Sequence, residues 1–364
     1  MSATRALIVG PAWVGDMVMA HSLFQLLKAR HPDRALDLIA PPATLPLAAR
    51  MPEIADAIVL AIPHGRFALR ERLRLGRGLR ERHYAQAYIL PRSYKSALPA
   101  WASGAARRTA YLGEARYGLI NDVRREPTGS KLKTVDRFLL LGLEPGEALP
   151  APPPPRLVAD RKAGQRGAER FGIHTDIPLL VLCPGAEYGP AKRWPTRHFA
   201  RLARRYHERG WQVLLLGGPH DRDIAHAIRE LSQDTCIDVA GRTTLLEAVD
   251  LMALAAAVVS NDSGLMHVAA SLHKPLVAVF GSSDPNHTPP LDDRAIPITL
   301  GLPCAARALP APAPWAIFAA SRTLRPSGWR PPSKGRLSYP SVSEPNRLAT
   351  TSRSKPCRRD VCYD

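Results

Sequence analysis

The sequence predicts an α/β protein with two doubly wound domains, and three observations support this prediction. Short apolar runs, each the length of a buried strand, alternate with segments of helical periodicity. This alternation occurs twice, and the proline-rich segment 144–155, EPGEALPAPPPP, separates the two series. We therefore expect one domain over residues 1–150, a second over residues 151–300, and a site in the cleft between them.

The first series begins with a short apolar run that Gly10 and Pro11 end. Helical spacing follows over residues 17–30, and His31-Pro32 is expected to end that helix. The basic segment 66–82 also has helical spacing. The predicted strands cover residues 5–10, 36–40, 57–61 and 88–90.

The second series repeats the same pattern after the proline-rich segment. Its predicted strands cover residues 179–183, 213–216, 237–239, 258–260 and 276–280. Its predicted helices cover residues 199–209, 221–231, 245–255 and the segment through His267. Beyond about residue 299 the periodicity ends, and residues 301–364, with ten prolines, have the composition of a disordered tail.

Charge and cysteine content limit the class of protein. The 364 residues carry a net charge of +18, of which the last 64 contribute +8 and the first 300 contribute +10. A moderately basic body suits anionic partners such as phosphates, acidic lipid surfaces or nucleic acid. The five cysteines form no CxxC pair, which disfavours a zinc site or disulfide framework. With neither a signal-peptide pattern nor a membrane-spanning run, we expect a cytoplasmic chain, or one on a membrane surface.

The strongest candidate for chemistry is the turn that follows the strand at residues 258–260. The apolar run stops at Asn261 and Asp262, and Ser263-Gly264 open a helix that carries His267. A strand that ends at a polar turn opening a helix makes an anion site, because free N–H groups and the helix dipole point out of the turn. In the alternative interpretation, Asp262 or Ser263 only caps the helix and His267 is a core residue.

Asp16 holds the equivalent position in the first series, between the first strand and the first helix. Open α/β sheets bind ligands at the carboxyl ends of their strands. A carboxylate there faces the predicted cleft, where it is placed to accept a proton from an attacking hydroxyl. The alternative is that Asp16 simply caps the helix.

The loop 183–195, CPGAEYGPAKRWP, follows another strand of the second series. Gly185 and Gly189 would let the backbone approach a ligand, and Lys192 with Arg193 would bind phosphates. The alternative is a solvated loop with surface charges, and the loop lacks the Walker pattern of ATP hydrolysis. Glu247, on the helix before the strand at 258–260, is placed to reach a ribose, or is solvated.

The basic segment 66–82 is most simply a solvated face. The functional alternative is contact with the phosphates of an anionic acceptor or with lipid headgroups. Aromatic residues are sparse here, with Phe67 and Tyr84 as the examples, which argues against nucleic-acid binding. No metal-ligand spacing and no Ser-His-Asp order stands out in the chain.

Four motifs in order resemble the ADP-heptose:lipopolysaccharide heptosyltransferase family, and in particular its heptosyltransferase II members. They are GPAWVGDMVMAHSLF (10–24), LPRSYKSAL (90–98), CPGAEYGPAKRWP (183–195) and NDSGLMHVAASLHKPLVAVFGSSDPNHTPP (261–290). The resemblance covers roughly residues 5–300. It implies a GT-B fold whose C-terminal domain holds ADP-L-glycero-D-manno-heptose and whose N-terminal domain holds the lipid A–inner core acceptor. A hydroxyl of the acceptor's first heptose would attack the donor with inversion of configuration.

The resemblance also implies roles for individual residues. Asp16 matches the family's proposed general base, and Lys192 its diphosphate-contacting lysine. Asp262, Ser263-Gly264 and His267 match its donor-binding signature, and Glu247 is a weaker match toward the nucleoside. The segment 66–82, together with Arg92 and Lys95, would face the phosphorylated acceptor at the inner face of the inner membrane. No metal or other cofactor is implied, and no nucleic-acid partner.

The chain departs from the family after about residue 300. The family continues with a Cys-rich segment and a closing helix, where this chain has CAARALPAPAPWAIFAASRTLRPSGW (304–329). Suitable codons for that string, read in another frame, can spell a family-like sequence, so we interpret the change as a frameshift near residues 301–306. Two alternatives to an active heptosyltransferase follow: an inactive donor-binding relative without its native C-terminus, and a basic nucleic-acid-binding protein.

Overall fold

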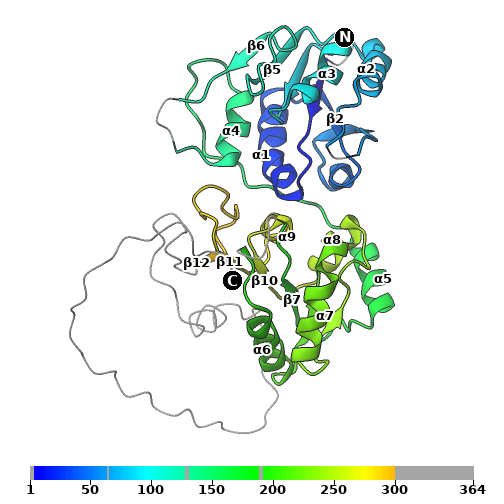
Figure 1. Cartoon of the computed structure of the whole chain (residues 1–364), viewed down its shortest axis with the longest axis vertical. Coiled ribbons are helices and arrows are strands. Elements are labelled where there is room, and N and C mark those ends of the chain that lie inside the picture. The colour runs from blue at the N-terminus through cyan, green and yellow to red at the C-terminus, as the bar shows by residue number, and fades with distance from the viewer. Residues whose placement is uncertain (1–3, 64, 128–130, 188–191, 300–364) are drawn as a thin grey trace, which may run out of the picture. The chain divides into compact units, whose positions relative to one another are not determined.

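The structure is a computed structural model that describes residues 4–63, 65–127, 131–187 and 192–299 (Figure 1). It contains two six-stranded parallel sheets, with the strand orders β3-β2-β1-β4-β5-β6 and β12-β11-β10-β7-β8-β9. In each order the chain starts near the middle and winds outward in both directions, so the predicted doubly wound fold is confirmed. The predicted domain boundaries at residues 150 and 300 stay predictions, and the predicted tail over residues 301–364 lies outside the described residues.

The first sheet is built from the N-terminal part of the chain. Its strands are β1 (Arg5–Val9), β2 (Ala35–Ala40), β3 (Ile54–Val59), β4 (Gln86–Ile89), β5 (Arg107–Tyr111) and β6 (Asp122–Arg124). The helices are α1 (Val14–Arg30), α2 (Leu69–Gly78), α3 (Tyr94–Ala102) and α4 (Thr134–Leu141), with short 3-10 turns η1 (Leu45–Arg50) and η2 (Arg80–Arg82). Alternate residues of β1 face opposite sides: Ala6 and Ile8 pack in the cluster that contains α1 and α4, and Leu7 packs with α3.

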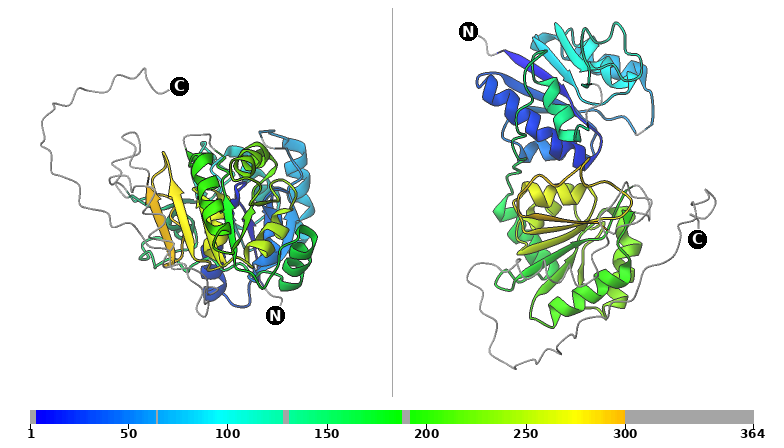
Figure 2. Two further views of the ribbon diagram at one scale, coloured as in Figure 1. Left: turned by 90° about the horizontal axis from the view of Figure 1, so that it is seen from below. Right: turned by 90° about the vertical axis from the view of Figure 1, so that its left-hand side faces the viewer.

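The second sheet is built from the C-terminal part of the described chain and also has helices packed against both of its faces. Its strands are β7 (Leu179–Cys183), β8 (Gln212–Leu215), β9 (Ile237–Asp238), β10 (Ala257–Asn261), β11 (Leu276–Phe280) and β12 (Ala295–Thr299). The helices are α5 (Arg161–Phe171), α6 (Thr196–His207), α7 (Arg222–Leu231), α8 (Leu245–Met252) and α9 (Gly264–Ser271), with a 3-10 turn η4 (Pro219–Asp221). Val181 packs in the cluster with α5, α8 and α9, whereas Leu180 and Leu182 pack with α6 and α7, so helices cover both faces (Figure 2).

Most of the predicted elements are present, with shifted ends. The first helix begins at Val14, three residues before the predicted start, so Asp16 belongs to the first turn of α1 instead of the loop before it. The predicted strand at 57–61 lies at 54–59. Six elements had no clear sequence signal: α3, α4, α5, β5, β6 and β12. β5 is an example, because its sequence RRTAY begins with two arginines instead of an apolar run.

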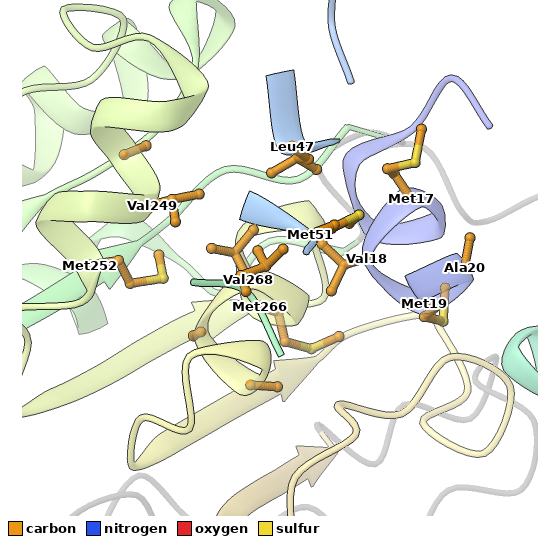
Figure 3. Close-up of a cluster of buried hydrophobic side chains, with 14 of the residues drawn as sticks. Met17, Val18, Met19, Ala20, Leu47, Met51, Val249, Met252, Met266 and Val268 are labelled. Carbon is orange, nitrogen blue, oxygen red and sulfur yellow. The ribbon is translucent and has the colours of Figure 1, made fainter. Parts of the chain in front are cut away.

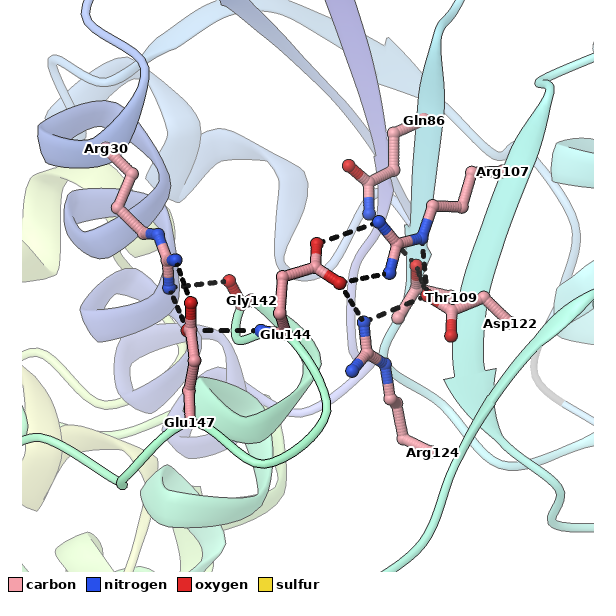
Figure 4. A network of polar contacts seen from close by, with 9 residues as sticks. All are labelled: Arg30, Gln86, Arg107, Thr109, Asp122, Arg124, Gly142, Glu144 and Glu147. Atoms are coloured by element: carbon pink, nitrogen blue, oxygen red, sulfur yellow. Dashed lines mark hydrogen bonds and ion pairs between the residues drawn. The ribbon is translucent and has the colours of Figure 1, made fainter.

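The proline-rich segment is fixed to the first sheet at its start. Arg107 on β5 holds the carboxylate of Glu144 with two hydrogen bonds of 2.8 and 2.7 Å (Figure 4). Arg30 at the end of α1 holds Glu147 in the same bidentate way, with two bonds of 2.6 Å. Further along, Ser22 of α1 donates to the carbonyl of Pro153 at 2.6 Å. The predicted linker contains no helix or strand, and the hydrogen bonds from Arg30 and Ser22 hold it beside α1.

One apolar cluster joins α1 to helices of the second sheet. It includes Met17 and Val18 of α1, Met51 after η1, Val249 of α8 and Met266 of α9 (Figure 3). All five side chains are almost completely buried. The first turns of α1 and α9 therefore pack in the same core, and this packing matters for the site. No helix in the described part of the chain is long and apolar enough to cross a bilayer.

Candidate active site

Asp16 is held in the first turn of α1, immediately after the carboxyl end of β1. Trp13 occupies the N-cap position of α1, so the interpretation of Asp16 as the capping residue is wrong. Burial raises the pKa of the Asp16 carboxyl above its usual value. Within the described residues, the carboxylate makes no hydrogen bond or ion pair to another side chain. A half-buried carboxylate that is free of a partner and has a raised pKa suits a general base.

Asp16 lines a pocket of about 890 Å³ on the first sheet, together with both predicted acceptor residues, Arg92 and Lys95. The structure adds Arg137, which the sequence interpretation did not include, and Arg72, which it included only as part of the basic segment 66–82. One carboxylate thus shares the pocket with four cationic side chains. Such a pocket is electrostatically suited to an anionic ligand, with the carboxylate placed to take up a proton.

The cations of this pocket are held in different ways. Arg92 forms an ion pair with Glu126 and its guanidinium lies over the ring of Tyr111, 4.8 Å from the centroid. Arg72 is buried, and its Nε donates to the carbonyl of Phe67 at 2.7 Å. Because Arg72 is buried, its charge is only partly solvated, and burial lowers the pKa of the guanidinium. An anion in the pocket would compensate that desolvation.

A fully buried arginine, Arg116, shapes the loop that carries Arg92 and Lys95. Its guanidinium donates to the carbonyl of Pro91 at 2.8 Å and to the hydroxyl of Ser96 at 3.1 Å. Burial lowers the pKa of Arg116 to about 10. Because backbone carbonyls from distant segments converge on one side chain, no local pattern in the sequence identifies this residue.

A second group of predicted site residues lies at the carboxyl end of β10. The buried side chain of Asn261 accepts a hydrogen bond from the backbone N–H of Trp194 at 3.0 Å and donates to the carbonyl of Pro184 at 2.7 Å. These two bonds hold both ends of the loop that carries Lys192. The Lys192 ammonium donates to the carboxylate of Asp262 at 2.7 Å, and Asp262 is only 6% exposed. The structure therefore brings together Lys192 and Asp262, which are 70 residues apart.

Ser263 and Gly264 open α9 as predicted, but the simple capping interpretation is wrong. Ser263 occupies the N-cap position, yet its hydroxyl makes no capping hydrogen bond to α9. Asp262 is engaged by Lys192 instead. The start of α9 is therefore built without the side-chain cap that helix N-termini usually have, and its dipole faces the Lys192–Asp262 pair.

His267 lies in α9 against the first turn of α1. It is 5% exposed, and burial lowers its pKa well below the usual range, so the imidazole is neutral near pH 7. A Cβ atom added to Gly15 would lie 2.8 Å from Cδ2 of His267, and one added to Gly264 would lie 2.8 Å from Cβ of Val14. Only glycine fits at these two positions, and the close approach places Asp16 one residue away from the contact with His267.

Two predicted roles meet competing contacts in the structure, and the role of Glu247 stays a prediction. Glu247 is committed to the start of α8, where its carboxylate accepts from the backbone N–H of Thr244 at 2.8 Å and pairs with Arg170 at 2.9 Å. Gly185 was expected to let the backbone approach a ligand, but the space that a Cβ would need is filled by the carboxylate of Asp221. Gly189 lies outside the described residues. Among the described residues, no group of three or more His, Cys, Asp or Glu side chains is arranged to hold a metal ion.

The fold and this site define a glycosyltransferase of the GT-B class, with polar residues at the carboxyl ends of two parallel sheets. The family model for glycosyltransferase family 9 (heptosyltransferase) matches residues 72–309. Lipopolysaccharide heptosyltransferase 2 of Escherichia coli K12 is 42% identical over 306 residues, covering 81% of this chain and 88% of that protein. Lipooligosaccharide heptosyltransferase 2 of Haemophilus ducreyi is 44% identical over 310 residues, with the same coverage.

A solved structure gives the same result. The E. coli ADP-heptose lps heptosyltransferase II has a TM-score of 0.78 and 38% identity, covering 88% of this chain and 98% of that one. The chain belongs to glycosyltransferase family 9, the heptosyltransferases.

Proposed function

We propose that the enzyme transfers L-glycero-D-manno-heptose from ADP-heptose to the first heptose of heptosyl-Kdo2-lipid A, with inversion at the anomeric carbon. The established names of its relatives, which are ADP-heptose and lipopolysaccharide heptosyltransferases, support the donor and the lipopolysaccharide acceptor. The observation that carries the mechanism is Asp16: a carboxylate with a burial-raised pKa in a cationic pocket, next to the contact between α1 and α9. This arrangement supports base-assisted attack by a hydroxyl of an anionic acceptor.

In the proposed step, the Asp16 carboxylate takes the proton of the acceptor hydroxyl as that oxygen attacks the anomeric carbon of the heptose. The bond from the anomeric carbon to the diphosphate oxygen breaks, and its electron pair leaves with ADP. Lys192 and the N-terminal end of α9 would stabilise the charge that develops on the diphosphate. Asp262 would hold the Lys192 ammonium in place, and the neutral His267 would pack against Gly15, next to Asp16.

The four cations of the 890 Å³ pocket would bind the acceptor. Phosphate and carboxylate groups on a lipid-linked inner core match the charge of Arg72, Arg92, Lys95 and Arg137. Glu247 is proposed as a nucleoside contact only on the family resemblance, because its carboxylate is engaged at the start of α8.

The direct test incubates the purified chain with ADP-heptose and heptosyl-Kdo2-lipid A and measures the release of ADP. We expect release that depends on both substrates, and a mass gain of one heptose on the acceptor. Kdo2-lipid A without its heptose serves as the control acceptor and should give no more release than buffer. Donor binding without ADP release from a folded sample would instead identify an inactive, donor-binding relative.

We further propose that the enzyme works as a peripheral protein at an anionic membrane surface. Exposed arginines of the segment 66–82 lie beside exposed apolar side chains: Arg66, Arg70, Arg74 and Arg77 with Phe67 and Leu69. The ring of Phe67 stacks on that of Tyr94 of α3, with centroids 6.4 Å apart, and Tyr94 is itself exposed. Arginines beside exposed aromatic rings are typical of surfaces that bind lipid headgroups.

Reversing the charge of Arg70, Arg74 and Arg77 to Glu should abolish most vesicle binding. Each basic residue contributes about 1 kcal/mol at an anionic surface, so removing three predicts a loss of about 100-fold or more in partitioning. Co-sedimentation with phosphatidylglycerol vesicles measures it. The matched control reverses three exposed arginines of α6, Arg197, Arg201 and Arg204. Equal losses from both triple variants would show only a general charge effect and contradict the proposed surface.

A further inference from the structure

A second pocket, of about 520 Å³, lies away from the residues of the active site. It is formed where the segment leading into α5 passes the C-terminal ends of α8 and α9. Leu157, Leu254 and Leu272 contribute apolar surface to it. Arg156, Arg161 and Lys274 contribute positive charge. Its volume falls in the range of small-molecule sites.

The three cations of this pocket lack acidic partners within the described ranges of the chain. Arg156, Arg161 and Lys274 form no ion pair with any described side chain. Eighteen ion pairs link other described side chains. The nearby carboxylates are engaged elsewhere. Asp250, which also lines the pocket, pairs with Arg50 at 2.5 Å and accepts from the backbone N–H of Asp160 at 2.8 Å.

Lys274 is the most informative of the three because it is only partly exposed. Burial lowers its pKa, and the neighbouring charge of Arg294 lowers it further. The carboxylate of Asp292, which pairs with the adjacent His273 at 2.7 Å and with Arg294 at 3.3 Å, is already engaged. A partly desolvated ammonium close to the charge of Arg294 costs free energy, and a bound anion would reduce that cost.

We propose that this pocket binds a phosphate-bearing anion through Arg156, Arg161 and Lys274. Guanidinium groups donate in a fork that matches phosphate oxygens, and three positive charges suit a dianion better than a single carboxylate. The bound group would connect the segment before α5 to the turn between α9 and β11. Phosphate in solution and a phosphomonoester lipid headgroup share this chemistry, and they are separated by experiment.

The test measures the rate at which acetic anhydride acetylates the Lys274 amine, using peptide mass spectrometry. Only the neutral amine reacts, and an anion that raises its pKa by about one unit reduces the neutral fraction about tenfold. We expect inorganic phosphate, compared with chloride at equal ionic strength, to slow labelling of Lys274. The exposed Lys131, which lines neither pocket, serves as the internal reference and should not change.

A second arm replaces soluble phosphate with phosphatidylcholine vesicles that contain phosphatidic acid, and compares them with phosphatidylcholine alone. Protection by inorganic phosphate assigns the site to a soluble ligand, and protection by phosphatidic acid alone assigns it to a lipid headgroup. Unchanged labelling of Lys274 in both arms overturns the proposal. Neither arm uses the sugar donor or acceptor, so this outcome leaves the proposed heptosyl transfer untouched.

A variant on the rim tests whether the pocket itself is responsible. Arg161→Gln should raise the phosphate concentration needed for half-protection of Lys274 about tenfold, the effect expected for one lost charge-assisted hydrogen bond. Arg166→Gln is the matched control, because Arg166 is exposed on the same helix and does not line the pocket. If both variants shift the titration equally, the protection reflects general charge and the proposed pocket is wrong.

Discussion

Asp16→Asn is expected to lower kcat for heptosyl transfer by about 10³-fold, within the usual range for loss of a general base. Asparagine keeps the size of the side chain and removes the proton acceptor. Donor affinity should stay within about twofold, since the proposed donor contacts come from Lys192 and α9. ADP release under saturating substrates gives kcat, and calorimetric titration with ADP-heptose gives the affinity.

The pH profile distinguishes a base from a merely structural carboxylate. A base acts when deprotonated, so kcat/KM should rise with pH through the pKa of Asp16, which burial places above the usual value for aspartate. Asp16→Asn should lose this acidic limb. Asp33→Asn, at an exposed position, is the matched control and should keep both the rate and the profile. Retention of more than about a tenth of the activity by Asp16→Asn would remove Asp16 from the role of base.

Three of the predicted site residues share one property that the sequence already shows. Asp16, Asp262 and His267 all follow the carboxyl end of a strand, where an apolar run gives way to a polar turn and a helix. In a parallel sheet the carboxyl ends of the strands lie along one edge. A local sequence pattern at these ends therefore predicts that residues from different strands lie close together. The pairing of Lys192 with Asp262 follows the same rule, because β7 and β10 are neighbours in the sheet.

The residues that the sequence did not reveal depend on contacts from far along the chain. Arg72 lies in a basic helical segment whose other arginines are mostly exposed, and only the fold shows that it is buried beside the pocket. Arg116 donates to the carbonyl of Pro91 and to the hydroxyl of Ser96, which lie 25 and 20 residues earlier in the chain. Gly185 was interpreted as space for a ligand, whereas it makes space for Asp221. Composition and spacing describe none of these contacts.

Lys192→Ala should lower kcat/KM for ADP-heptose by about 10²- to 10³-fold, the range found when a group that stabilises developing charge is removed. The substitution also leaves the carboxylate of Asp262, 6% exposed, without its ammonium partner. An uncompensated buried charge destabilises a fold by about 3–5 kcal/mol, so the melting temperature should fall as well. Arg197→Ala, at an exposed position in the first turn of α6, is the matched control and should have a much smaller effect on kcat/KM.

Combining Lys192→Ala with Asp262→Asn separates the two effects. Asp262→Asn alone keeps the cation and loses only its anchor, so we expect a loss in kcat/KM of about tenfold. If Asp262 acts through Lys192, the double variant should be no less active than Lys192→Ala, and it should regain thermal stability because the buried carboxylate is gone. Additive losses in kcat/KM would contradict this, since they would require Asp262 to contact the donor independently of the lysine. The cycle therefore tests whether the ion pair is one functional unit, with the ammonium as the group that meets the diphosphate.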